Sequence, residues 1–262
     1  GDSSHCSSGG SFWLLAPSPA VRSTVAMDPD DEWTPEQLEL AASRRQTLLE
    51  FSLVTFIVVY VLLQKKVLPK KWWLPLTRLY FYPMILPNYL WRRTMIKGTY
   101  FSRVDDVLLL GAVPLVFVGH IKELHRLGVR AVVNMMAEYE GPLKAYAETE
   151  PPMQQLYLPV TDHMEPSPEQ LQAAVGFIAE HASRGEKVLV HCKGGHGRGA
   201  AVAFAYLVSE HGGSLTPEQA QERLSSIRHV RKKLYLQENL RGFAQMVSAS
   251  APRGGGPARV MM

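Results

Sequence analysis

The sequence predicts an α/β domain, in which a central and mostly parallel sheet is flanked by helices, preceded by an apolar membrane-associated helix near the N-terminus. Two observations predict the domain. Short apolar runs such as residues 187–191 (KVLVH) are typical of strands covered on both faces, and they alternate with longer segments of helical pattern. The third observation is the uncharged run at residues 51–63, which predicts the separate helix.

Length and cysteine count limit what the chain can be. Its 262 residues leave room for one catalytic domain of roughly 150 residues and an appendage. Cys6 and Cys192 are the two cysteines, and they lie far apart in unlike surroundings. A disulfide framework and a four-cysteine metal site are therefore excluded, and a reducing compartment is compatible with the chain.

Residues 1–33 are expected to form a disordered, low-complexity N-terminus. They are rich in Ser, Gly and Ala, and Met27 is a candidate start. Neither start gives an Arg-rich transit peptide, and the stretch MDPDDEW is too acidic for one. The first helix is expected from Thr34, because this N-cap is followed by Pro35 and by Gln37 at the capping-box position.

The uncharged run at residues 51–63 leaves two interpretations open. At about 1.5 Å per residue it covers ~20 Å, less than the ~30 Å hydrocarbon core of a bilayer. Glu50 and Lys65 bound it closely, so a full span would need snorkelling side chains or a locally thinner bilayer. The alternative is a buried helix of a soluble domain.

Residues 34–98 are predicted to associate with a membrane surface, because a basic and aromatic segment follows the apolar run. No Asp or Glu occurs between Phe51 and Val104, and three of the five tryptophans lie in this interval. Cations attract anionic headgroups, and Trp and Tyr rings favour the interface. Nucleic acid is the competing partner for such a segment, but the adjacent apolar helix favours a membrane, so no nucleic-acid binding is expected. The cations of the segment are Lys65, Lys66, Lys70, Lys71, Arg78, Arg92, Arg93, Lys97 and Arg103.

The α/β domain is expected over residues 99–249. Two of its helix starts repeat the capping box, at Ser167 and Thr216. Residues 250–262 are expected to be a disordered tail. The expected elements are strand 107–111, helix 119–128, strand 129–136, strand 156–160, helix 168–185, strand 187–191, helix 200–213, helix 217–230 and helix 234–249.

The stretch VHCKGGHGRGA, residues 190–200, is predicted to bind phosphate and to carry a nucleophile. A glycine-rich loop can turn its backbone N–H groups toward an anion, and the helix after it adds its positive end. The same field favours a thiolate at Cys192, which could attack phosphorus and form a cysteinyl-phosphate. Arg198 offers a planar fork for two phosphoryl oxygens. The predicted phosphate-binding residues between them are Lys193, Gly194, Gly195, His196 and Gly197.

A buried structural thiol is the alternative for Cys192. The spacing H-C-x-x-G-x-x-R and its position between a strand and a helix favour the nucleophile, with His191 in a supporting role. A Walker-type nucleotide site is excluded, because no G-x-x-x-x-G-K-[ST] string occurs. Lys193 and His196 give the loop a basic rim, which suits a polyanionic substrate.

Asp162 is the predicted general acid. It follows the strand at 156–160, thirty residues before Cys192, and should lie on a loop at the same edge of the sheet. A carboxylic acid there could protonate the leaving group and then serve as base for the attacking water. His163 and Glu165 are weaker alternatives for this role, and a solvated loop aspartate is the structural alternative. Residues 137–142 (AEYEGP) could add a wall or be purely structural.

On these residues, the chain resembles the cysteine-dependent dual-specificity phosphatases, and more narrowly the mitochondrial protein-tyrosine-phosphatase-like phosphatidylglycerophosphate phosphatases. The resemblance covers about residues 78–249 and includes RLYFYPMILPNYL, RVDDVLLLGAVP, NMMAEYE, LPVTDHMEPS, VHCKGGHGRGA and SIRHV. It implies the dual-specificity phosphatase fold, Cys192 as nucleophile, Arg198 as phosphate clamp and Asp162 as acid, without a metal or another cofactor. It also implies an anionic phospholipid substrate and a role in making phosphatidylglycerol, the precursor of cardiolipin. The implied location is the mitochondrial inner membrane, with a plastid or endoplasmic reticulum membrane as the alternative.

Three departures from the family pattern bear on activity. Gly199 stands where the family usually has Ser or Thr, whose hydroxyl assists the sulfur as it leaves the phosphoenzyme, so the second step is expected to be slow. His196 replaces the usual Arg or Ser, and His229 replaces the usual proline. A dual-specificity protein phosphatase, a phosphoinositide phosphatase, and a weakly active or lipid-binding pseudophosphatase therefore stay as alternatives.

Overall fold

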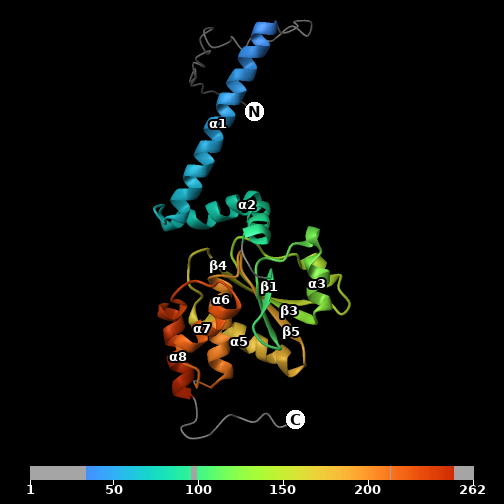
Figure 1. Ribbon diagram of the computed structural model, residues 1–262, viewed down its shortest axis with the longest axis vertical. Coiled ribbons are helices and arrows are strands. Elements are labelled where there is room, and N and C mark those ends of the chain that lie inside the picture. Colours follow the sequence, from blue (N-terminus) through green and yellow to red (C-terminus); the bar gives the residue numbers. More distant parts are fainter. Residues whose placement is uncertain (1–33, 96–98, 213, 251–262) are drawn as a thin grey trace, which may run out of the picture. The chain divides into compact units, whose positions relative to one another are not determined.

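The computed structural model of this chain describes residues 34–95, 99–212 and 214–250 (Figure 1). The two segments predicted to be disordered, residues 1–33 and 250–262, lie outside these ranges except for Ser250. The chain divides into two compact units, residues 1–57 and 58–262. The second unit contains the whole α/β domain.

Helix α1 (Pro35–Gln64) begins where the capping box predicts. The N–H of Thr34 donates to Gln37 Oε1 at 2.9 Å, and the N–H of Gln37 donates to Thr34 Oγ1 at 3.3 Å. By length and composition, α1 could cross a membrane. Its apolar side chains are exposed, Phe51 at 72% for example. This exposure argues against the alternative, a helix buried in a soluble domain.

Five strands form one sheet in the order β1-β2-β5-β3-β4. All neighbouring pairs are parallel except β1 with β2. The four predicted strands are present, whereas β1 is too short to show an alternating pattern in the sequence. The strands are β1 (Phe101–Arg103), β2 (Leu108–Gly111), β3 (Val129–Met136), β4 (Gln154–Val160) and β5 (Lys187–His191).

Helices surround this sheet, and short 3-10 segments lie between several elements (Figure 1). The α-helices are α2 (Trp73–Met95), α3 (His120–Arg126), α4 (Leu143–Ala147), α5 (Pro168–Ser183), α6 (Arg198–Glu210), α7 (Pro217–Ile227) and α8 (Glu238–Ser250). The 3-10 segments are η2 (Lys70–Trp72), η3 (Val116–Val118) and η4 (Leu234–Leu236).

The core lies on both faces of the sheet, as the apolar strands predict. Leu108 and Leu110 of β2 pack in one cluster with Phe204 of α6. Leu109 points to the other face and packs in a second cluster with Leu124 of α3. Side chains alternate between the faces of a strand, so β2, β3 and β5 contribute to both clusters, and both faces of the sheet are covered at its centre.

Helix α2 occupies the basic and aromatic segment, for which the sequence predicts an interface but no helix. Pro83 and Pro87 lie inside it, and an interior proline removes a backbone hydrogen bond. Phe81 is fully buried and Tyr80 is 3% exposed, whereas Tyr82 on the outer side is 69% exposed. Packing against the α/β domain therefore outweighs the two prolines.

The C-terminal helix begins later than the sequence predicts. Residues 234–236 form η4, and Gln237 has an extended backbone with ψ of 135°. Helix α8 then begins at Glu238. The helix expected from residue 200 instead starts at Arg198, so residues 192–197 are the whole connection between β5 and α6.

Candidate active site

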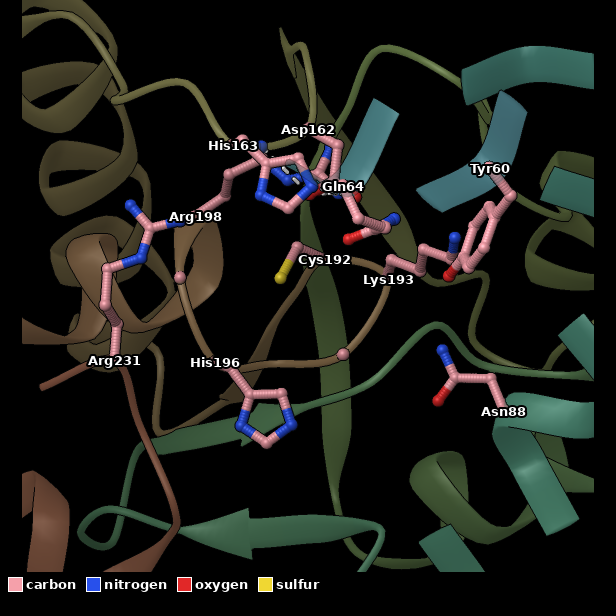
Figure 2. Close-up of a pocket in the computed structure, with 12 residues that line it drawn as sticks. Tyr60, Gln64, Asn88, Asp162, His163, Cys192, Lys193, His196, Arg198 and Arg231 are labelled. Carbon is pink, nitrogen blue, oxygen red and sulfur yellow. Dashed lines mark hydrogen bonds and ion pairs between the residues drawn. The ribbon is translucent and has the colours of Figure 1, made fainter. Parts of the chain in front are cut away.

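The loop of residues 192–197 follows the carboxyl end of β5 and leads into α6. Cys192 is 3% exposed, and the N–H of Gly195 donates to its Sγ at 3.2 Å. Figure 2 shows this sulfur facing the pocket. This N–H and the N-terminus of the 13-residue helix α6 both direct positive partial charge toward the sulfur.

Gly195 is required by the backbone of this loop. Its φ is +70°, a conformation that side chains disfavour. A Cβ at this position would also lie 2.5 Å from the carbonyl oxygen of Gly111. The loop can therefore close on Cys192 only with glycine here.

His191 directly precedes the nucleophile candidate and is fully buried. Burial lowers its pKa to about 3, so the imidazole is neutral at physiological pH. Neither ring nitrogen has a hydrogen-bond partner among the described residues, and a neutral ring adds no charge that would compete with Arg198.

The guanidinium of Arg198 is held by several acceptors although it is only 3% exposed. Its Nη1 and Nη2 each donate to one oxygen of Glu138 at 2.7 Å. Nη1 also donates to the carbonyl oxygen of Val160 at 2.8 Å, and Nη2 lies 3.1 Å from Asp162 Oδ1. Burial alone would lower the pKa of Arg198, but Asp162 and Glu138 outweigh burial and raise it.

Glu138 has a contact at the site that the sequence did not predict. From the sequence it is only one of residues 137–142, which could form a wall of the site. It is the second residue after β3, and its side chain is 1% exposed. Its bidentate contact fixes the plane of the Arg198 fork. An acidic residue at the carboxyl end of a strand that neighbours β5 is the signal that could have pointed to it.

Asp162 lies on the loop after β4, and the structure brings it to the Arg198 side of the pocket (Figure 2). Its Oδ1 accepts a hydrogen bond from the N–H of His163 at 3.0 Å. Burial raises the pKa of Asp162, but Arg198, His163 and Lys193 act more strongly together, so the pKa lies below its ordinary value. In the unliganded protein Asp162 is therefore a carboxylate.

The two weaker alternatives for the acid have different places. His163 lines the pocket beside Asp162, and burial is the main cause that lowers its pKa. Glu165 faces away toward α8, where its Oε2 lies 3.5 Å from the N–H of Asn239. Geometry thus leaves Asp162 and His163 as the candidates at the pocket.

The pocket around Cys192 has a volume of about 250 Å³. Lys193, His196, Arg198 and Arg231 make it basic, and Arg231 is a member that sequence reasoning missed. The N–H of Arg231 donates to the carbonyl oxygen of His196 at 2.8 Å, which ties its segment to the loop. Three further residues, Tyr60, Gln64 and Asn88, line the pocket from α1 and α2 (Figure 2).

His229 and Gly199, two departures from the family pattern, have different consequences. His229 accepts a hydrogen bond from His196 Nδ1 through its backbone carbonyl, which any residue could supply. Gly199 is buried, and a Cβ there would lie 3.3 Å from His191 C and from Leu110 Cδ1. A serine would fit only if these neighbours moved by a few tenths of an ångström.

Comparison with known proteins places the α/β domain in a family. Residues 99–242 match the DSP-PTPase phosphatase domain of the Swiss Army Knife type, PTP-SAK. Phosphatidylglycerophosphate phosphatase PTPMT2 of Arabidopsis thaliana is 36% identical over 154 residues, which are 58% of this chain and 65% of that protein. PTPMT1 of the same plant is 33% identical, and the match spans 44% of its length.

A mammalian relative is matched over nearly its whole length. Phosphatidylglycerophosphatase and protein-tyrosine phosphatase 1 of Mus musculus is 32% identical over 187 residues, which are 68% of this chain and 94% of that protein. Among solved structures, the crystal structure of PTPMT1 superposes with a TM-score of 0.51 at 30% identity, covering 59% of this chain and all of that one. The crystal structure of PTPMT1 in complex with PI(5)P gives 0.51 at 31% identity, covering 58% of this chain and 98% of that one.

Proposed function

Because this chain belongs to the DSP-PTPase phosphatase family, with phosphatidylglycerophosphate phosphatases among its relatives, we propose that it hydrolyses a phosphomonoester through a cysteinyl-phosphate. The proposed substrate is phosphatidylglycerophosphate, and the product is phosphatidylglycerol. The observation that carries the proposal is the convergence of the Cys192 sulfur, the Arg198 fork and Asp162 on one basic pocket.

In the first step, the Cys192 thiolate attacks phosphorus, and the bond from phosphorus to the leaving oxygen breaks. The N–H groups of the loop and Arg198 hold the phosphoryl oxygens, where charge gathers in the transition state. Asp162 gives its proton to the leaving oxygen, so that phosphatidylglycerol departs as a neutral alcohol.

Asp162 must gain a proton before this step, and the Arg198 contacts suggest how. Nη1 and Nη2 of Arg198 are engaged by Glu138, Val160 and Asp162. A substrate phosphate that binds Nη2 would displace Asp162 from this cation and bring a negative charge beside it. Both changes raise the pKa of Asp162, so binding of the substrate itself would favour the protonated acid.

In the second step, water attacks the phosphorus of the cysteinyl-phosphate. Asp162, now a carboxylate, takes the proton of this water. The S–P bond breaks, Cys192 leaves as a thiolate, and inorganic phosphate is released. Gly199 supplies no hydroxyl to the departing sulfur, so this step is expected to limit turnover.

A lipid headgroup fits the pocket better than a lone phosphate. Lys193 and Arg231 add cations beside Arg198, which suits a substrate with a phosphomonoester and a second, diester phosphate. Gln64 and Asn88 contribute amides to the pocket lining, where they could bond the hydroxyl of a glycerol headgroup. The apolar length of α1 supports a membrane location, and we assign this to the mitochondrial inner membrane.

A phosphoinositide is the second candidate substrate. The related PTPMT1 structure is a complex with PI(5)P, and the same basic pocket suits an inositol phosphate. A phosphoprotein is a further candidate, because the mouse relative is also named a protein-tyrosine phosphatase.

Phosphate release by the full chain from a panel of substrates tests these assignments. Phosphatidylglycerophosphate, PI(5)P and a phosphotyrosyl peptide should be presented with anionic vesicles, with Cys192→Ser as the blank. We expect the highest kcat/KM with phosphatidylglycerophosphate. Faster turnover of PI(5)P or of the peptide would overturn the substrate assignment, and oxyanion binding without turnover of any substrate would identify a pseudophosphatase.

A further inference from the structure

Helix α2 makes a polar contact with the loop that follows β3. Nε and Nη2 of Arg78 donate to the carbonyl oxygen of Ala137 at 3.3 and 3.2 Å. Two hydrogen bonds from one guanidinium restrain the position of the carbonyl oxygen more than a single hydrogen bond would. This contact joins residues 59 positions apart in the sequence.

An aromatic contact reinforces this link on the same side of the loop. The rings of Phe81 and Tyr139 stack with their centroids 5.0 Å apart and their planes 24° apart. Phe81 is fully buried, so its position is set by the core. The backbone carbonyl of Tyr139 in turn accepts a hydrogen bond from Asn134 Nδ2 at 2.9 Å.

Glu138 lies between these two anchored residues and serves the active site. Ala137 and Tyr139 contact α2, whereas the Glu138 carboxylate holds both Nη atoms of Arg198 at 2.7 Å. A shift of the loop would therefore move the carboxylate that orients the Arg198 fork.

We propose that Arg78, together with Phe81, is a positioning residue for catalysis, acting through Ala137 and Glu138 on Arg198. The inference rests on the proposed function only in that Arg198 binds the substrate phosphate. It gives a second residue of α2, besides the pocket-lining Asn88, a role at the active site, although α2 precedes the matched phosphatase domain at residues 99–242. Arg78 itself touches no reacting atom.

The expected cost follows from orientation. The reaction slows when the guanidinium that holds the phosphoryl group is misplaced, and a displacement of about 1 Å can lower the rate about 100-fold. The Arg78 side chain is exposed, so its removal should spare the fold. We expect Arg78→Met to lower kcat/KM for a small soluble aryl phosphate, and the affinity for tungstate, by about 10-fold.

The test compares five variants, Arg78→Met among them, with the same soluble substrate, which removes any effect of membrane binding. Arg78→Lys keeps one donor and should recover part of the loss. Arg126→Met deletes an exposed arginine of α3 and should match the unmodified protein. Glu138→Gln and its double variant with Arg78→Met form a cycle, in which coupled residues give non-additive losses.

The decisive result is the size of the Arg78 effect in the Glu138→Gln background. If Arg78 acts through Glu138, Arg78→Met should add less than about twofold there. An equal loss in both backgrounds, or an Arg78→Met variant as active as Arg126→Met, would overturn the proposal. If Glu138→Gln does not fold, the tungstate affinities of Arg78→Met and Arg78→Lys decide. A positioning role predicts that Arg78→Lys binds tungstate more tightly than Arg78→Met. A purely structural role would change Tm and leave the two variants with equal affinities.

This outcome is distinct from failure of the proposed function. If the unmodified chain binds no tungstate, the phosphate site is wrong and the positioning role falls with it. If it binds tungstate and Arg78→Met binds equally well, the positioning role alone is wrong.

Discussion

At the scale of single residues, the resting state of Asp162 shapes the expected pH dependence. Because Arg198, His163 and Lys193 hold its pKa below the ordinary value, the protonated fraction falls steadily as pH rises. We expect kcat/KM to be highest in the acid range and to decline toward neutral pH. Asp162→Asn should lower kcat and flatten this decline, as measured with a small aryl phosphate across pH. A decline that persists in Asp162→Asn would assign the acid elsewhere, with His163 as the next candidate.

The same shift affects stability with a defined sign. A carboxyl group with a lowered folded-state pKa stabilises the protein above its unfolded pKa, and the contribution is lost as pH falls through the folded value. For Asp162 that window lies below the ordinary aspartate pKa of 3.8. Asp162→Asn should therefore lower the free energy of unfolding near neutral pH and leave it unchanged at strongly acid pH.

Cys192 is expected to be essential for turnover but not for binding. Cys192→Ser removes the thiolate and leaves the loop N–H groups and Arg198 in place, so turnover should fall by more than about 1000-fold while tungstate still binds. Calorimetry and phosphate release measure the two effects. Turnover that survives in Cys192→Ser would refute the covalent mechanism.

Gly199 offers a test of the second step. A serine hydroxyl could assist the departing sulfur, and its Cβ contacts of 3.3 Å are tight without being blocked. The unmodified chain should show a rapid burst of leaving group followed by slow turnover. Gly199→Ser should speed the slow phase, and Gly199→Ala, with the same Cβ and no hydroxyl, should not. Equal traces for the serine and alanine variants would show that the hydroxyl is not what limits turnover.

At the scale of elements, the helix caps are where sequence and structure agree best. Ser167 accepts from the N–H of Gln170 at 3.2 Å, and the Gln170 side chain accepts from the N–H of Ser167 at 3.0 Å. We expect Ser167→Ala to lower the free energy of unfolding by about 1 kcal/mol. Urea unfolding measures this loss, and Ser167→Asn, which also caps, should restore most of it. No difference between the alanine and asparagine variants would mean that the cap contributes nothing to stability.

Local patterns explain why the strands, the capped helices and the loop at residues 192–198 could be predicted. Their signals lie in consecutive residues, such as the apolar run before Cys192. Helix α2 could not be predicted this way, because Pro83 and Pro87 argue against a helix and the burial of Phe81 depends on distant parts of the chain. Glu138 was missed for a similar reason, since its contact with Arg198 joins residues 60 positions apart.

At the scale of the whole molecule, charge and hydropathy along the chain predict how it meets a membrane. The cations Lys65, Lys66, Lys70 and Lys71 are all exposed. We expect the full chain to float with anionic vesicles and to bind neutral ones less, because polybasic segments gain about 1 kcal/mol per cation near an anionic surface. Replacing these four lysines with glutamine should reduce binding to anionic vesicles, and added salt should act in the same direction. Equal flotation with both vesicle types would contradict an electrostatic contribution.

The residues that line the pocket bear on how the concentration of a lipid substrate should be counted. Gln64, the last residue of α1, lines the same pocket as Cys192, and under the proposed function the lipid that enters this pocket is a component of a bilayer surface. The relevant substrate concentration is then the mole fraction within the surface, not the amount per volume of solution. Diluting the substrate with inert lipid at constant total substrate should slow the enzyme, as in surface-dilution kinetics.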